Sequence, residues 1–204
     1  MRKAIKTALI VAAAFLLTPV AAFSATITFD DLSIGTNVTN QYASLGVLFS
    51  IANGQSFVSN GATIGTFPGD LGSNFLVVLT SPLYQQPYGV LTATFVDPAN
   101  PSYPGYVSGS SISFYLADTE WNVSVTSYDL NDVAIETKLL TVGYATINLT
   151  SGLVHSIKFT DVGGDGFIVD NFAFGEVTGI PEPSTFALIG GSLLLLGLAL
   201  RRRR

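Results

Sequence analysis

The stretch SISFYLADTEWNVSVTSYD, residues 111–129, decides the fold class. Apolar side chains recur at every second position on both sides of its centre. They are Ile112, Phe114 and Leu116 in the first half, and Trp121, Val123 and Val125, followed by Ser127, in the second. Because successive side chains of a strand point to opposite faces, this period of two predicts two strands that each bury one face.

Similar runs of β-branched and aromatic residues, broken by Gly, Pro, Asn and Asp, fill residues 25–176. Leu91, Ala93 and Phe95 form one such buried face. The predicted strands are Ala25–Phe29, Gly46–Ile51, Phe75–Thr80, Val90–Val96, Ser111–Leu116, Asn122–Tyr128, Ala134–Leu140, Ala145–Leu149, Val154–Thr160 and Gly166–Phe174. This density of short strands predicts an all-β fold, an antiparallel β-sandwich of jelly-roll type. We expect the Pro- and Tyr-rich stretch 81–107 to form long extended loops on one rim.

The charge of the interior excludes several classes of function. Thirteen acidic residues and only two lysines, Lys138 and Lys158, give residues 30–176 a formal charge of −11. Such a surface repels phosphate backbones, so we expect no nucleic-acid partner. The chain has no cysteine and one histidine, His155, which excludes disulfides, thiolate zinc sites and multi-histidine metal sites.

The N-terminus is typical of an export signal. A basic start is followed by an apolar run from Ala8 to Leu17 and then by small residues. We predict a signal peptide over residues 1–24, an N-terminal helix cleaved after Ser24, with Ala22 as the other candidate. The expected partners are therefore a signal peptidase and the export machinery, and the predicted ectodomain spans residues 25–176.

The C-terminus, residues 177–204, combines three features in a fixed order. Pro181, Glu182 and Pro183 precede 15 apolar or small residues, 186–200, that predict a short transmembrane helix. Arg201, Arg202, Arg203 and Arg204 follow and would hold that end in the cytoplasm. Prolines keep the chain just before the helix extended and accessible to a protease.

This tail resembles the PEP-CTERM sorting signal of Gram-negative bacteria, and also the C-terminal segment of some ice-binding proteins. The resemblance implies processing by an exosortase. The protein would be held in the inner membrane by its tail, then delivered to the cell surface or to an exopolysaccharide matrix of a biofilm. A plain membrane anchor is the alternative.

The interior is similar to the extracellular β-sandwiches that precede such tails and to lectin-like carbohydrate-binding jelly rolls, through TITFDDL, GTNVTNQYASLGVLFS and SIKFTDVGGDGFIVDNFAF. In those folds, acids on the first and last strands often hold a structural calcium ion. Here Asp30 and Asp31 end the first strand, and Asp170 interrupts the apolar last one. One structural Ca²⁺ bound by Asp30 or Asp31 with Asp170 is the prediction. The alternative is that these acids accept hydrogen bonds from loop amides.

Four tyrosines in the Pro-rich stretch are the candidate ligand contacts: Tyr84, Tyr88, Tyr103 and Tyr106. Their rings could stack on sugars, or they could simply pack the loops. The predicted function is a non-catalytic surface or matrix protein that binds glycan or adds bulk to the matrix. The alternative is a secreted glycan hydrolase that uses Asp118 and Glu120 as its carboxylate pair. A catalytic role for His155 lacks a nucleophile motif.

Overall fold

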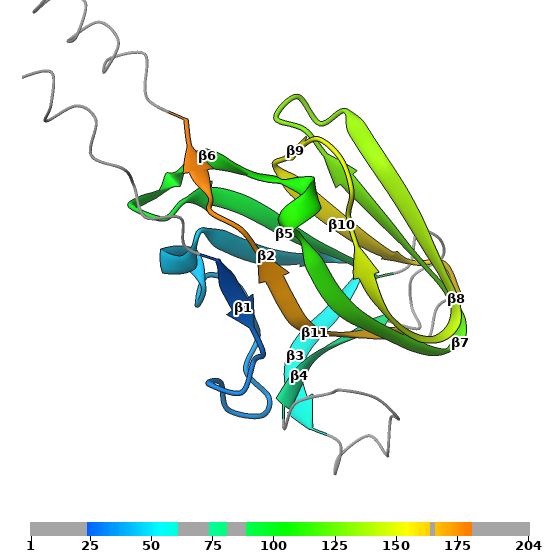
Figure 1. Cartoon of the computed structure of the whole chain (residues 1–204). Coiled ribbons are helices and arrows are strands. Elements are labelled where there is room, and N and C mark those ends of the chain that lie inside the picture. The colour runs from blue at the N-terminus through cyan, green and yellow to red at the C-terminus, as the bar shows by residue number, and fades with distance from the viewer. Residues whose placement is uncertain (1–23, 61–73, 81–88, 164–165, 181–204) are drawn as a thin grey trace, which may run out of the picture.

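The computed structural model describes residues 24–60, 74–80, 89–163 and 166–180. Twelve strands and two 3₁₀ turns make up this part of the chain (Figure 1). They are β1 (Ala25–Ile27), η1 (Ala43–Leu45), β2 (Val47–Ala52), β3 (Gly54–Asn60), β4 (Asn74–Thr80), β5 (Val90–Asp97), β6 (Asn100–Ser108), η2 (Gly109–Ser111), β7 (Ser113–Tyr128), β8 (Ala134–Asn148), β9 (Leu153–Val154), β10 (Ser156–Asp161), β11 (Phe167–Phe174) and β12 (Thr178–Gly179).

All strand pairs are antiparallel, and they form two layers that share one long hairpin. In the first layer β11 pairs with β1, β4 and the first part of β7, and β3 extends the layer beyond β4. In the second layer β5 pairs with β2 and β10, and β10 pairs with the last part of β7. β8 follows β7 along both parts. The predicted all-β antiparallel sandwich is confirmed, and β1 indeed lies beside β11.

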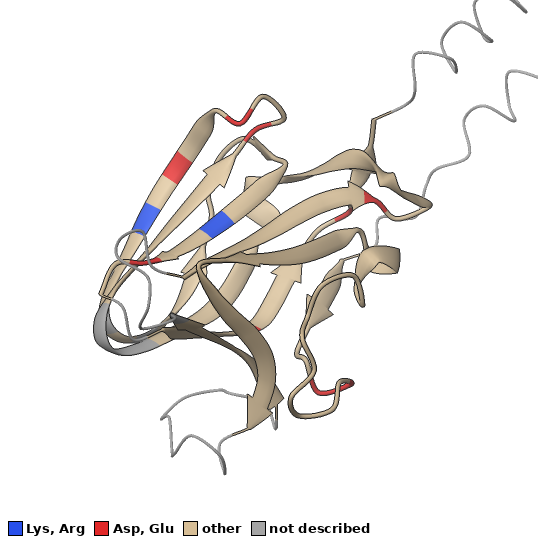
Figure 2. Ribbon diagram, turned by 180° about the vertical axis from the view of Figure 1, so that it is seen from behind, with Lys and Arg blue, Asp and Glu red and all other residues tan. Residues whose placement is uncertain are grey.

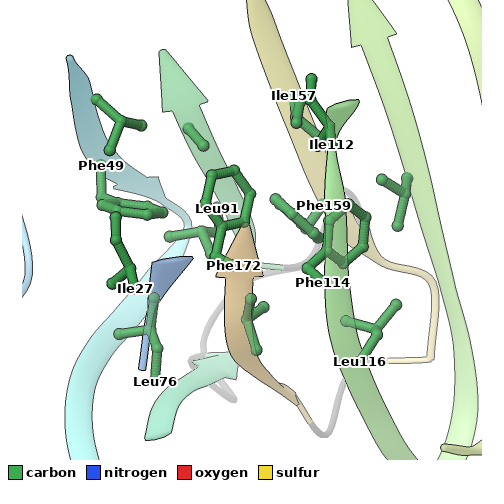
Figure 3. Packing of buried hydrophobic residues seen from close by; sticks show 14 of the residues in the cluster. Ile27, Phe49, Leu76, Leu91, Ile112, Phe114, Leu116, Ile157, Phe159 and Phe172 are labelled. Atoms are coloured by element: carbon green, nitrogen blue, oxygen red, sulfur yellow. The ribbon is translucent and has the colours of Figure 1, made fainter. Parts of the chain in front are cut away.

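The alternating apolar residues of the stretch 111–129 are confirmed as core residues. Phe114 and Leu116 from the first layer and Val123 and Val125 from the second are at most 1% exposed. Phe114 lies 4.8 Å from Phe159 of β10, measured between ring centroids, and 5.9 Å from Phe172 of β11. Figure 3 shows these rings filling the space between the layers. Such burial supplies most of the stability of a sandwich without disulfides.

Several predicted boundaries are wrong. The two strands predicted within residues 111–128 are one strand, β7, and those predicted at 134–140 and 145–149 are one strand, β8. β3 was not predicted. Residues 100–108 form β6 rather than a rim loop, since Pro101 and Pro104 are compatible with a strand that pairs only in part. β12, which was not predicted, pairs with β6.

A second, smaller apolar cluster lies on the other face of the first layer. It consists of Phe75, Val77, Tyr115, Ala117 and Ile168, all at most 5% exposed. Asp170 belongs to this face, because it lies two residues after Ile168 in β11 and opposite Tyr115 in the register. Asp170 is fully buried, and its carboxylate accepts a hydrogen bond from the Asn171 amide.

Candidate binding site at the covered edge

One edge of the sandwich is covered by the segment 33–42, here named the edge segment. It runs along β2 and β3 and hydrogen-bonds to both. The amide of Val58 donates to Thr36 O over 3.0 Å, and the amide of Phe49 donates to Thr39 O over 2.7 Å. Val38 lies between these bonds and is 1% exposed. The edge segment thus bridges the two layers without forming a strand of its own.

A pocket of about 390 Å³ opens between the edge segment and the strands that it covers. Its lining comes from two stretches, Asn37, Val38 and Thr39 on one side and Ile51, Gly54, Gln55 and Ser56 on the other. These residues offer amide and hydroxyl groups above aliphatic surface, and none of them is charged. A pocket of this size and chemistry suits a neutral, polyhydroxylated ligand.

The edge segment is held in place by its own side chains. Gln41 Oε1 accepts a hydrogen bond from the Thr39 amide over 2.6 Å, and Gln41 Nε2 donates to Asn37 O over 2.8 Å. One side chain therefore fixes the backbone of Asn37 and Thr39, the two polar pocket residues of the edge segment. Because the backbone at Asn37 and Thr39 is already ordered, less conformational entropy would be lost when a ligand binds.

Tyr42 anchors the end of the edge segment in the core. Its ring packs against Phe29 and Phe49, with centroid distances of 5.8 and 6.4 Å. Its hydroxyl donates to Asp31 Oδ1 over 2.6 Å. Burial, together with this hydrogen bond and the negative charges of Asp31 and Asp30, raises the pKa of Tyr42 far above its ordinary value of 10.0. The phenol therefore remains a donor at every physiological pH.

The acids proposed as calcium ligands have hydrogen-bond donors as neighbours. Asp30 Oδ1 accepts from the Asn74 amide over 2.8 Å, Asp31 accepts from Tyr42, and Asp170 Oδ1 accepts from the Asn171 amide over 2.7 Å. Within the described ranges, no three His, Cys, Asp or Glu residues form a group that could hold a metal ion. The structural Ca²⁺ stays a prediction, which is tested by comparing melting temperatures with and without a chelator.

Asp161 shows the alternative role of these acids clearly. It is 1% exposed at the end of β10. Its two carboxylate oxygens accept hydrogen bonds from the amides of Gly163 and Gly166 over 2.8 and 2.9 Å. This arrangement fixes the start of the turn into β11. Asp161 thus has the role that the alternative interpretation gives to Asp30, Asp31 and Asp170.

The predicted tyrosine rim is only partly described. Tyr103 and Tyr106 lie on β6 and are half-buried, and the backbone of Tyr106 pairs with Thr178 of β12. Neither residue lines the pocket of the covered edge. Tyr84 and Tyr88 lie outside the described residues. A ligand contact by any of the four stays a prediction.

The described part of the chain does not bring the candidate catalytic side chains together. His155 Nδ1 lies 2.7 Å from Gly105 O, which ties the half-buried ring to the backbone of β6. The backbones of Asp118 and Glu120 lie on β7, but their side chains are outside the described part. Figure 2 shows the described acidic residues spread over turns, loops and strands rather than gathered at one place.

Sequence reasoning missed the pocket residues Asn37, Thr39, Gln55 and Ser56. The alternation of Asn37 and Thr39 around the buried Val38 was a local signal for a half-buried extended segment. However, the other half of the pocket belongs to β3, whose polar composition hid it. No local pattern brings the two stretches together.

The predicted sorting residues Pro181, Glu182 and Pro183, the helix at 186–200 and the cluster Arg201–Arg204 lie outside the described residues, as do residues 1–23 of the predicted signal helix. Among the residues that are described, no helix has the length and apolarity needed to cross a membrane. The sequence model of the PEP-CTERM protein-sorting motif matches residues 179–204. This tail marks a secreted surface protein that is processed by an exosortase.

No curated protein matches the chain. Among solved structures, the chain is similar to family 29 carbohydrate-binding modules. One structure of a mutant module has 14% identity and a TM-score of 0.47, with 76% of this chain and 92% of that one covered. Another has 15% identity and a TM-score of 0.44, with 81% and 98% covered. At this level no residue of the chain can be matched to a ligand contact of those modules.

Proposed function

We propose that the sandwich is a non-catalytic glycan-binding domain, which the sorting tail delivers to the surface or the exopolysaccharide matrix of a Gram-negative bacterium. The observation that carries the proposal is the neutral pocket at the covered edge. Its amides and hydroxyls can both donate and accept, as sugar hydroxyls do, and the partly exposed Ile51 offers apolar surface to the C–H face of a sugar ring.

The pocket lining contains no charged side chain, which favours glycan binding over glycan hydrolysis at this site. Glycoside hydrolysis uses a pair of carboxyl groups on either side of the scissile bond, and neither an acid nor a histidine lines this pocket. The described acids nearest to the edge segment, Asp30 and Asp31, accept hydrogen bonds that hold the fold. We therefore propose that the domain binds a glycan of the matrix and does not cleave it.

The tail supports the route to that location. During export, the predicted helix at 186–200 holds the protein in the inner membrane, and an exosortase reads the sequence from Pro181 to Pro183. Replacing Pro181, Glu182 and Pro183 with alanine is expected to leave the protein in the inner-membrane fraction. Unchanged release to the surface would contradict this role of the tail.

The binding function is tested with the purified full chain on an array of neutral and acidic glycans. Wild-type protein should be retained on neutral glycans. The variants Gln55→Ala and Asn37→Ala should each weaken that retention about five- to fiftyfold, since each removes one or two hydrogen bonds. Ser151→Ala, an exposed residue between β8 and β9 that does not line the pocket, is the matched control and should bind like the wild type.

Two outcomes would overturn the assignment to this pocket. Retention that is unaffected by Gln55→Ala but lost in Tyr103→Ala or Tyr106→Ala would move the site to the β6 rim. Release of reducing sugar by the wild-type protein, and its loss in Asp118→Asn or Glu120→Gln, would establish the hydrolase alternative.

A further inference from the structure

The edge of the sandwich opposite the covered edge is formed by β8. Over residues 134–141, which precede the corner of the hairpin, this strand pairs with β7 on one side. In the part of the chain that the structure describes, β8 pairs with no other strand. Its other side therefore presents backbone N–H and C=O groups that are free to pair.

The other described edges of the layers are covered by neighbouring segments. The edge segment hydrogen-bonds along β2 and β3, as given above, and β12 lies along β6. Natural proteins usually protect a free edge with a charged side chain, because like charges repel a second copy of the same strand. Lys138 in the middle of β8 looks like such a protection.

However, Glu136 on the same face of β8 removes this protection. Glu136 lies two positions before Lys138, and the two side chains form an ion pair with Nζ and Oε1 2.9 Å apart. In an antiparallel pair of identical strands related by a two-fold axis at Thr137, Glu136 of each copy lies opposite Lys138 of the other. Cross-strand pairs of opposite charge stabilise a sheet, so the edge is complementary to itself.

The same register covers exposed apolar surface. Leu139 is 57% exposed and would be partly covered by the second copy, whereas Ile135 already packs against the main core of its own chain. Thr137, whose hydroxyl is 3.1 Å from that of Thr126, would lie opposite its own counterpart. The charge pattern, the free backbone groups and the exposed leucine thus favour one register.

We propose that a second copy of this chain pairs along β8, antiparallel and with the two-fold axis at Thr137. The second layers of the two copies then form one continuous sheet. The two pockets lie at the far edges of this sheet. If these pockets bind glycan as proposed above, the pair is bivalent and can link two polysaccharide chains, which raises its retention on a matrix by avidity.

Cysteine crosslinking of the full chain tests the register, because the natural sequence has no cysteine. In Thr137→Cys the two Cβ atoms across the axis should be about 4.5–5.5 Å apart, close to the separation in a disulfide. Mild oxidation should convert most of this variant to a covalent dimer. In Leu139→Cys, the control, the two cysteines would be about 13 Å apart along the strands and should not crosslink.

Sedimentation velocity across a range of concentrations tests the association itself. Lys138→Glu replaces both attractive contacts with contacts between two glutamates and should weaken dimerisation about tenfold or more. The melting temperature of the diluted monomer shows whether this variant is still folded. Crosslinking of Leu139→Cys instead of Thr137→Cys would overturn the register. A wild-type protein that stays monomeric, with neither variant crosslinked, would overturn the proposal, whereas glycan binding by that monomer would leave the proposed function intact.

Discussion

The two edges of the sandwich hold the same pair of layers together by different means. At the covered edge, a separate segment packs Tyr42 into the core and bridges β2 and β3 with backbone hydrogen bonds. At the β8 edge, the β7–β8 hairpin bends and belongs to both layers, so the chain itself connects them. One edge depends on apolar burial and the other on covalent continuity.

At each edge, a hydrogen bond that depends on the protonation of one side chain joins distant parts of the chain. Tyr42 donates to Asp31 at the covered edge. At the β8 edge, the Glu136 carboxylate accepts from the amide and the hydroxyl of Thr150, each over 2.9 Å. One interaction needs a protonated phenol and the other a deprotonated carboxylate. The two edges should therefore fail at opposite ends of the pH scale.

The largest expected difference between the edges comes from truncating their apolar side chains. Tyr42→Ala removes a ring that is 5% exposed and should lower the free energy of unfolding by about 3–5 kcal/mol. Leu139→Ala at the β8 edge, in dilute protein, should change it by about 0.5 kcal/mol or less. Urea unfolding measures both. Equal losses would show that the covered edge does not depend on its aromatic anchor.

The second effect concerns the corner of the hairpin. Asp118 pairs with Gly143 and Asn122 with Thr141, so β7 carries two more residues than β8 between these pairs. Gly143 accommodates the bend with φ 117°, and no atom lies within 4 Å of where a Cβ would be. Gly143→Ala should therefore cost about 1–3 kcal/mol through backbone strain alone. Thr141→Ala is the control, and an equal effect of both variants would argue against strain at the corner.

The same hairpin shows which parts of the fold could be predicted from the sequence. The alternation of Phe114 and Leu116, and of Val123 and Val125, is a local pattern, and it correctly identified the buried faces. The polar residues 118–120 between these halves are equally local, and they suggested a turn. The strand nevertheless continues through them as a bulge, since pairing with β8 stops at Asp118 and resumes at Asn122.

The candidate site was harder to predict because it is not local. Asn37 and Gln55 share a pocket only because the edge segment folds back along β3. The surroundings of Asp170 are also set by non-local structure. A β-bulge follows it in β11, where Asn171 has φ 48°, and the register places Asp170 opposite Tyr115 of the second apolar cluster. Such positions depend on strand register, which composition does not specify.

The third prediction is the response of the β8 edge to acid. The Glu136 carboxyl is partly desolvated, but hydrogen bonds from Thr150 and the charge of Lys138 outweigh this and lower its pKa from 4.5 to about 2. Its contribution to stability is therefore present above pH 4.5 and is lost as the pH falls toward 2. Glu136→Gln should lower the free energy of unfolding by about 1–2 kcal/mol at pH 7. The difference from wild type should shrink steadily below pH 4.5, and a difference independent of pH would contradict it.

The smallest effect is expected for the matching hydroxyl at the covered edge. Tyr42→Phe keeps the ring and removes only the hydrogen bond to Asp31, so it should cost about 0.5–1.5 kcal/mol at neutral pH. The raised pKa of Tyr42 has a second consequence. Above pH 10 the phenol ionises in the unfolded chain but not in the folded one, so wild-type stability should fall as the pH rises. Phenylalanine cannot ionise, so urea unfolding at pH 7 and pH 11 should show the variant losing less stability than the wild type over that interval. If both proteins lose the same amount, the hydroxyl at the covered edge is not the alkaline counterpart of Glu136.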